Sequence, residues 1–249
     1  MAGRRVANPG SAIGEAIGKL IEADLAKAIT QVAESLGCGV RSFSMQNHMQ
    51  SKHQIDIVVG DRAGKPIILV EPKYLRYTKH NWDKGSRLCT AHYRLRRTYP
   101  SIRKSIGILA GSWTQGSIAF IQSFGVETHR IPFDHIADVM EQYGVPFRWE
   151  EDDKTTPGEA WQAYCQLTDS ATKQIAIALT EPVRQAVVKS VDKTLRSDPD
   201  APKRIERIEV SVQTTDGEYL VYNYRSAPDA IRGLAAFIAD VDDFRGLMG

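Results

Sequence analysis

The sequence predicts an α/β fold in which a mixed β-sheet is flanked by helices. A long apolar stripe at helical spacing comes first, and three strand-like segments separated only by turns follow it. Later strand-like segments alternate with helical ones. Strands joined by turns pair antiparallel, whereas strands joined by helical crossovers pair in parallel, so the two patterns together predict a mixed sheet.

The elements are expected in the order α-β-β-β-α-β-α-β-α. The first helix covers 11–36 and stops at the "GCG" of 37–39, and the basic helix at 84–100 stops at Pro100. The turn "DRAGK" joins two strands of the meander. Strands are expected at 40–44, 53–60, 66–73, 105–111 and 126–131, and further helices at 115–124 and 133–144.

The acidic stretch "EEDDKTTPGE" at 150–159 predicts a boundary between a core at 1–149 and an accessory part at 150–249. Beyond it we expect two or three helices at about 158–196, a linker, and a β-hairpin that turns at Asp216-Gly217. A last helix begins near Pro228, with Ser226 as its cap and Asp229 three residues on. This accessory part would serve dimerisation or DNA contact.

Composition excludes several classes of protein. The chain has 249 residues, of which 42% are hydrophobic, but no apolar run fits a signal peptide or a membrane span. We therefore expect a cytoplasmic protein with no membrane partner. Its three cysteines are far apart, so the sequence suggests neither a disulfide framework nor a zinc or iron–sulfur site.

Charge is unevenly distributed along the chain. The formal net charge is +2, but the stretch 73–104 has ten lysines and arginines against one acid, Asp83, and so carries +9. The other residues, 22 basic and 29 acidic, sum to −7. A basic stretch in an otherwise acidic chain is typical of a face that binds a polyanion. The alternative is a solvated helix whose charges keep the protein soluble.

Polar residues interrupt the third strand-like segment. In "ILVEPK", Glu71 and Lys73 are two apart and so project from the same face of the strand. The turn at 61–65 can bring Asp56, from "QIDIVV", alongside them. Two carboxylates and a lysine form an oxygen-rich pocket suited to Mg²⁺, which can activate water and stabilise charge on a phosphate. The alternative is a surface ion pair at the ends of ordinary strands.

These motifs and the α-β-β-β-α-β order around them resemble the PD-(D/E)XK nuclease superfamily, which has the restriction-endonuclease-like fold. The resemblance covers roughly residues 11–131. It implies that Asp56 and Glu71 bind Mg²⁺, or Mn²⁺ as a substitute, with the Pro72 carbonyl as a possible further ligand, and that Lys73 orients or activates the attacking water. Pro72 lacks a backbone donor and fits an interior strand only if its neighbours splay there.

Many members of the superfamily also supply a glutamate from the first helix, a few residues after a glycine. In "GKLIEADL", Glu22 follows Gly18 in this way, and Glu15 after Gly14 is the rival. The residue before Asp56 is Ile55, where the name of the superfamily has a proline. Asp56, Glu71 and Glu22 are thus the expected metal ligands, and Lys73 completes the expected catalytic set.

The function expected from this resemblance is a Mg²⁺-dependent DNA endonuclease of restriction or defence type. It would act on double-stranded DNA as a homodimer, without a nucleotide cofactor. The alternatives are a non-catalytic DNA-binding protein on the same fold and a structure-specific repair or recombination nuclease. Trp82 and Trp113 either stack on bases or pack, and His129 and His135 are read as structural. The expected phosphate contacts are Arg76, Lys79, His80, Lys84, Arg87, Arg94 and Arg97.

Overall fold

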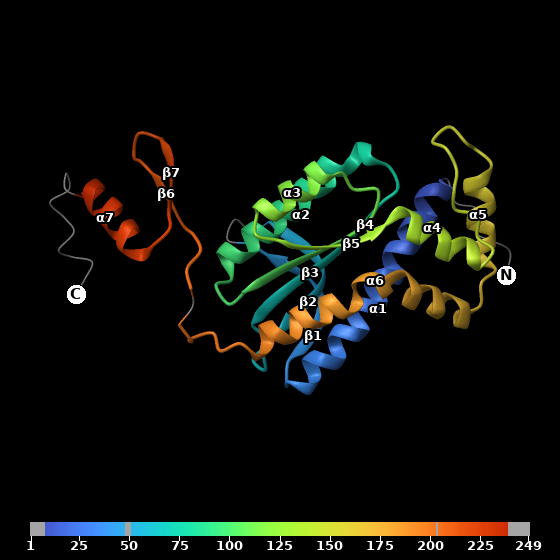
Figure 1. Ribbon diagram of the computed structural model, residues 1–249, viewed down its shortest axis with the longest axis horizontal. Coiled ribbons are helices and arrows are strands. Elements are labelled where there is room, and N and C mark those ends of the chain that lie inside the picture. The colour runs from blue at the N-terminus through green and yellow to red at the C-terminus, as the bar shows by residue number, and fades with distance from the viewer. Residues whose placement is uncertain (1–7, 48–50, 203, 239–249) are drawn as a thin grey trace. The chain divides into compact units, whose positions relative to one another are not determined.

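A five-stranded mixed sheet forms the centre of the computed structural model, which describes residues 8–47, 51–202 and 204–238 (Figure 1). The strand order follows the sequence. The first three strands pair antiparallel and the last three in parallel, so the predicted α/β fold with a mixed sheet is confirmed. The strands are β1 (Gly39–Gln46), β2 (Lys52–Gly60), β3 (Pro66–Leu75), β4 (Lys104–Gly111) and β5 (Glu127–Pro132).

Helices cover both faces of this sheet (Figure 1). One apolar cluster joins α1, α4 and α6 to one face, and two others join α2 and α3 to the opposite face. The helices are α1 (Pro9–Ser35), the short 3-10 helix η1 (Thr78–His80), α2 (Asn81–Thr98), α3 (Gln115–Ser123), α4 (Phe133–Gln142), α5 (Thr156–Cys165) and α6 (Asp169–Arg196).

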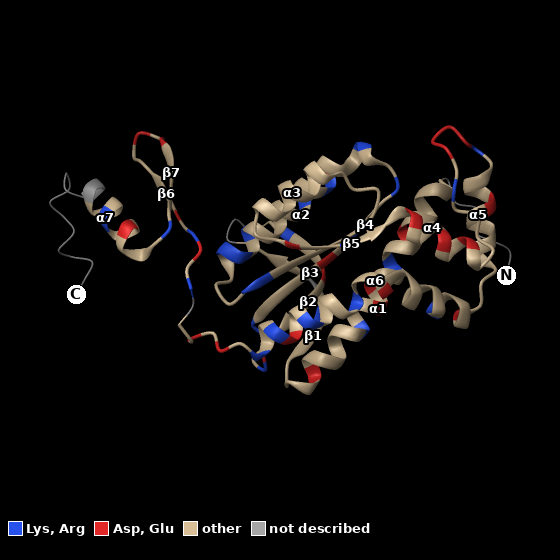
Figure 2. Cartoon of the chain, viewed as in Figure 1, with Lys and Arg blue, Asp and Glu red and all other residues tan. Residues whose placement is uncertain are grey.

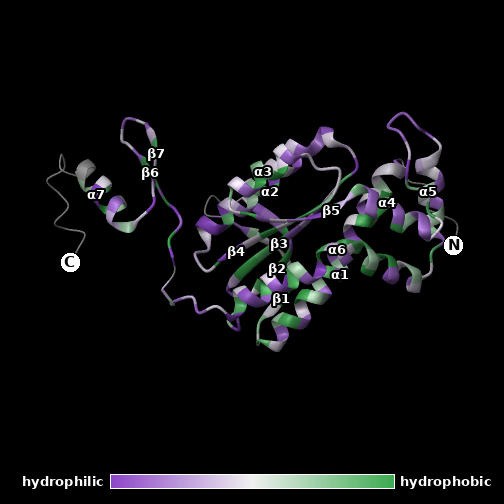
Figure 3. Ribbon diagram, in the orientation of Figure 1, coloured by the Kyte–Doolittle hydropathy of each residue, from purple (hydrophilic) through white to green (hydrophobic). Residues whose placement is uncertain are grey.

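The helix α1 packs along the sheet through a stripe of apolar residues at four-residue intervals (Figure 3). Ile13, Ile17, Ile21 and Leu25 on this stripe are all at most 1% exposed. The side chain of Asn8 caps the start by accepting a hydrogen bond from the Ser11 amide. This helix also carries Glu22, whose charge interacts with Asp56 of β2 and Lys73 of β3.

The helix α6 packs on α1 and completes the core. The division of the chain therefore differs from the boundary expected near residue 150. Val183, Val187 and Val191 of α6 lie in the same apolar cluster as the α1 stripe. Arg184 also donates from Nε to the Asp24 carboxylate of α1 at 2.9 Å. The chain divides into units 1–197 and 198–249, because α5 and α6 belong with the sheet.

The second unit contains the predicted hairpin and final helix. Its strands β6 (Ile208–Gln213) and β7 (Tyr219–Tyr224) pair antiparallel, and α7 spans Ala227–Ile238. The turn includes Gly217 at φ 94°, and Ser226 caps α7 by accepting from the Asp229 amide at 3.2 Å. These features confirm the hairpin turn and the cap expected from the sequence.

In the part of the chain that the structure describes, no helix combines the length and the apolar character needed to cross a membrane.

Candidate active site

The strands β2 and β3 stop pairing just where the two sequence motifs meet. Their pairing runs from Gly60–Pro66 to Ile57–Val70 and ends there, whereas β3 stays paired with β4 as far as Leu75. Asp56 and Glu71 are the first residues beyond this end, one on each strand. Pro72 has no backbone N–H to donate to β2, but β2 has already separated from β3 at this point, so no β2 carbonyl loses a partner. This explains how a proline can stand in an interior strand.

The Lys73 side chain lies between the two strand carboxylates. Its Nζ is 2.5 Å from Oε1 of Glu71 and 3.5 Å from Oδ2 of Asp56. The Glu71 side chain is 7% exposed, whereas those of Lys73 and Asp56 are about a quarter exposed. The structure thus brings the three motif residues together in a pocket that is closed around Glu71 and open toward Asp56.

The two carboxylates keep Lys73 charged. Burial alone would lower the pKa of Lys73, but Glu71 and Asp56 raise it more, and the result lies above the ordinary lysine value. Burial raises the pKa of Asp56, and the neighbouring Glu71 raises it further against the opposing effect of Lys73. Lys73 is therefore an ammonium at neutral pH, so it acts as a hydrogen-bond donor and a positive charge.

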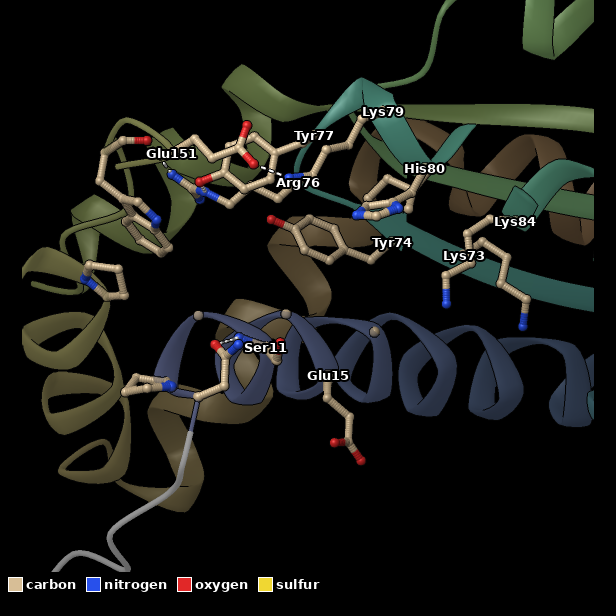
Figure 4. Close-up of a pocket in the computed structure, with 18 of the residues that line it drawn as sticks. Ser11, Glu15, Lys73, Tyr74, Arg76, Tyr77, Lys79, His80, Lys84 and Glu151 are labelled. Carbon is tan, nitrogen blue, oxygen red and sulfur yellow. Dashed lines mark hydrogen bonds and ion pairs between the residues drawn. The ribbon is translucent and has the colours of Figure 1, made fainter. Parts of the chain in front are cut away.

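Glu22, and not Glu15, belongs to this group. Burial raises the pKa of Glu22, and the charge of Asp56 raises it further, while Lys73 opposes both. Glu15 forms an exposed ion pair with Lys19 at 2.7 Å, and its carboxylate points away from Lys73 and Tyr74 (Figure 4). Of the two helix glutamates, Glu22 is the one whose charge interacts with Asp56 and Lys73.

His92 is a site residue that the sequence reasoning missed. It lies on α2 with 0% of its surface exposed, and its Nε2 is 2.9 Å from Oε2 of Glu71. Donation from Nε2 to the carboxylate fixes the Glu71 side chain from the side opposite Lys73. His92 stands four residues after Leu88 and three before Leu95, so it lies on the apolar face of α2. A polar residue on an apolar helix face is the sequence signal that could have identified it.

The Glu71 carboxylate stays ionised although it is buried. Burial alone would raise the pKa of Glu71, but His92 and Lys73 lower it more, and the result lies below the ordinary value for glutamate. A buried carboxylate that is ionised and held from two sides is pre-organised to bind a cation. The buried histidine on α2 is thus part of the chemistry of the site.

The basic residues expected to contact phosphate have different neighbours in the structure. Arg87 forms an exposed ion pair with Asp83, and Arg97 lies over the Tyr93 ring. The charge of Arg94 acts on His53, whose pKa is lowered first by burial and then by Arg94. Several of these basic residues lie along α2 (Figure 2).

Arg76 departs from the expected role. Its guanidinium donates to the carbonyls of Phe147 and Trp149 at 3.1 and 3.0 Å and lies 3.3 Å from the centre of the Trp149 ring. These contacts fix the segment after α4 to the end of β3. Arg76 is therefore a structural residue in this conformation and is not an open phosphate contact.

Lys79, His80 and Lys84 line the cavity beside the site, and Lys79 is paired with Glu151. Trp82 is 58% exposed, whereas Trp113 is 3% exposed and donates to the Ala110 carbonyl, so Trp113 packs.

His129 pairs with Glu127, and His135 lies 2.9 Å from the Ala178 carbonyl. Both contacts agree with a structural reading of these histidines.

The donor set fits a hard divalent cation in charge and in kind. The Asp56 and Glu71 carboxylates lie on either side of the Lys73 ammonium, whose Nζ marks a cation position between them, and the charge of Glu22 interacts with both Asp56 and Lys73. Among the described residues, no three histidine, cysteine, aspartate or glutamate side chains converge closely enough to hold an ion between them. Mg²⁺ commonly takes one or two protein carboxylates and keeps several waters, so Asp56 and Glu71 are sufficient.

Comparison with known proteins gives no assignment. No family model matches the chain, and no curated protein matches it. One similar solved structure is the crystal structure of AF1548, a protein of unknown function. It is 12% identical, and the match covers 71% of this chain and 98% of that chain with a TM-score of 0.30. This score is too low to assign a fold, so the functional argument depends on the site.

Proposed function

We propose that the protein is a Mg²⁺-dependent DNA endonuclease of restriction or defence type, with a restriction-endonuclease-like core. The observation that carries the proposal is the position of the Lys73 ammonium between the Asp56 and Glu71 carboxylates, where β2 and β3 separate. A buried ionised carboxylate, a second carboxylate open to solvent and a charged lysine are the groups that metal-assisted phosphodiester hydrolysis needs.

Each side chain has a role in this reaction. Asp56 and Glu71 would hold the cation, with Glu22 completing its negative surroundings from α1. When bound, Mg²⁺ supplies a Lewis acid that polarises the phosphate and lowers the pKa of water. Lys73 donates a hydrogen bond to the attacking water or to a phosphate oxygen, and its charge opposes the negative charge that develops there. His92 keeps the Glu71 carboxylate in its orientation.

The substrate proposal depends on charge. The stretch 73–104 carries +9 in a chain of net charge +2, and it begins at the catalytic strand and continues along α2. Such a surface attracts the phosphate backbone without reading its sequence. A two-fold symmetric homodimer is the simplest assembly that can cut both strands of a duplex, so we propose that the protein acts as a homodimer.

Cleavage of a supercoiled plasmid tests the proposal. With Mg²⁺ or Mn²⁺, the wild-type protein should nick or linearise the plasmid, and EDTA should stop the reaction. Lys73→Ala should reduce the rate by about 10²–10³-fold, as expected when a group that stabilises developing charge is removed. Lys65→Ala, at an exposed lysine in the turn before β3, is the matched control and should keep the wild-type rate.

A second candidate function is a non-catalytic DNA-binding protein on the same fold. The observation that favours it is the closed set of contacts in which Lys73 and His92 already satisfy Glu71. A structural ion-pair network of this kind needs no metal. If the wild-type protein binds DNA but cuts it with neither Mg²⁺ nor Mn²⁺, and calorimetry detects no binding of either ion, the nuclease proposal is wrong and this alternative replaces it.

A further inference from the structure

A cavity of about 860 Å³ lies beside the candidate active site (Figure 4). Residues of α1, of the end of β3, of η1 and of the segment 149–157 line it. Glu22 and Lys73 belong to the same lining, so the cavity and the proposed catalytic group share a wall. Any molecule in the cavity therefore lies next to the reacting position.

Three glycines open the α1 side of this cavity. Gly10, Gly14 and Gly18 stand at four-residue intervals and so lie on one face of the helix. The Tyr74 ring packs so closely on α1 that a Cβ at Gly14 would lie 3.2 Å from its Cε1 atom. A Cβ at Gly18 would meet no heavy atom within 4 Å, so the cavity is open at that point, near Glu22.

Two polar groups on the inner wall have unmet hydrogen-bonding capacity. The Tyr74 hydroxyl and Nη1 of Arg76 are buried, and neither forms a well-aligned hydrogen bond among the described residues, although Arg76 lies close enough to lower the pKa of the Tyr74 hydroxyl against the larger effect of burial. Buried donors are rarely left unpaired in native proteins, and an anionic oxygen would accept from both. The inner wall therefore carries more donors than acceptors, which suits an anionic ligand.

Charge at the cavity favours the same kind of ligand. Six lysines and arginines line it against four carboxylates, and two of those carboxylates, Glu15 and Glu151, are already paired with lysines. Lys84 lines the cavity, points toward α1, and forms no salt bridge within the described ranges of the chain (Figure 4). Tyr77 and His80 add flat rings on which a base can stack.

The size of the cavity limits what can enter it. Its volume lies within the roughly 300–1,000 Å³ typical of pockets for small ligands. A specific duplex interface is instead spread over about 1,000–2,500 Å² of protein surface, which a pocket for a small ligand does not provide. Only a short length of one strand can enter the cavity, whereas a duplex has to stay outside it.

We propose that this cavity takes the unpaired end of one DNA strand, so that the junction between single and double strand lies at the Asp56–Glu71–Lys73 site. The inference depends on the proposed nuclease function and adds to it a preference for DNA with an unpaired tail. Lys84 binds a phosphate of the tail, the donor-rich inner wall suits its negative charge, and the aromatic rings stack on its bases. The glycine face of α1 provides the space that the tail needs.

A blocking variant tests the cavity directly. Gly18→Leu adds a side chain where the structure has open space, and leucine suits a helix better than glycine does, so folding is preserved. Gly116→Leu is the matched control, because Gly116 is also helical, also has no heavy atom within 4 Å of a built Cβ, and does not line the cavity.

Binding is measured in EDTA by fluorescence anisotropy, with a blunt duplex and the same duplex carrying a tail of either polarity. The wild-type protein should bind a tailed duplex at least about tenfold more tightly, the effect of one stacked base. Gly116→Leu should keep this preference. Gly18→Leu should lose it and bind tailed and blunt duplexes about equally.

The binding and cleavage readouts separate the two proposals. Equal wild-type binding of blunt and tailed duplexes overturns the cavity inference, and so does an undiminished preference in Gly18→Leu, even if the plasmid is cut. A tail preference that Gly18→Leu abolishes, without cleavage in Mg²⁺ or Mn²⁺, supports the cavity as a strand-binding site and rejects the nuclease function. Competition by a free mononucleotide as strong as that by a tail would assign the cavity to a nucleotide and overturn the inference.

Discussion

At the scale of single residues, Glu71 shows how a charge can be kept in the core. An unpaired buried carboxylate is costly because it loses its hydration, and Glu71 is only 5% exposed. Lys73 and His92 offset that cost from two sides and hold its pKa below the ordinary value. Removal of either partner should therefore be costly, since it would leave part of the carboxylate without a donor.

A double-mutant cycle measures the contact between Glu71 and His92. The free energy of unfolding in urea, with EDTA present, is compared for Glu71→Gln, His92→Leu and the double variant. We expect a coupling energy of about 1–3 kcal/mol, because the hydrogen bond is buried and involves a charged group.

The more exposed pair Glu127–His129 is the matched control and should give a smaller coupling. If the Glu71 and His92 effects add within about 0.5 kcal/mol, the two side chains do not interact and His92 has no part in the site.

The sequence predicted part of this site. Asp56, Glu71 and Lys73 were predicted to meet because alternation in the third strand and the length of the turn fix their faces. Glu22 could not be separated from Glu15, since seven residues bring a helix back to nearly the same face. The role of Arg76 was missed because its partners, Phe147 and Trp149, are more than seventy positions away along the chain.

At the scale of elements, Glu127 connects three of them. The Glu127 carboxylate, at the start of β5, pairs with Lys104 of β4 and accepts a hydrogen bond from Ser190 of α6 at 3.0 Å. Burial alone would raise the pKa of Glu127, but Lys104, Ser190 and His129 lower it more, so its pKa lies below the ordinary value. The ionised form of Glu127 therefore holds α6 against the sheet edge.

This arrangement predicts how stability changes with acid. A carboxyl whose pKa is depressed in the folded state stabilises the fold above its unfolded pKa, and this contribution is lost as the pH falls through the folded pKa. Glu127→Gln should therefore lower the free energy of unfolding at pH 7, by at most about 1 kcal/mol because solvent screens a half-exposed group.

The difference between wild type and Glu127→Gln should shrink as the pH falls below the ordinary glutamate value. Urea unfolding at a series of pH values measures it. A constant difference from neutral to strongly acidic pH would show that the charge of Glu127 contributes nothing to stability.

The boundaries of helices and strands were predicted well where local patterns set them. The boundary between the two units was not predicted. The stripe of α1 and the cap of α7 follow from spacing within a few residues. The acidic stretch at 150–159 has the composition of a linker, but α6 beyond it is held by contacts with α1, which lies about 150 residues earlier. Tertiary packing of this kind leaves no local pattern for sequence reasoning to detect.

At the scale of the whole molecule, the division at Ser197 separates a large unit from a small one. The large unit contains the sheet, the candidate site and all helices from α1 to α6. The small unit has a two-stranded sheet and one helix, and its described core is slight, with Ala230 as its buried residue. The site therefore depends on the large unit alone.

Two truncated chains test this division. A chain of residues 1–197 should unfold cooperatively and keep the fold of the large unit, whereas a chain of residues 1–149 should fail to fold. Its loss of Ile175, Leu179, Val183, Val187 and Val191 from the core removes roughly 7–15 kcal/mol of burial, comparable with the whole stability of a domain.

Circular dichroism and thermal unfolding distinguish the two chains. A cooperative transition of the 1–149 chain near that of the 1–197 chain would place the boundary at 150 after all.

The packing of α6 on α1 also determines when the fold can be completed during synthesis. The sheet covers part of the apolar side of α1, but the part that packs on α6 stays uncovered until residues 169–196 leave the ribosome. At ~5–20 residues per second, that interval is roughly 10–30 s. The nascent chain thus exposes the α6-binding side of α1 throughout that interval, which makes this side of α1 a surface that a chaperone for apolar segments could cover.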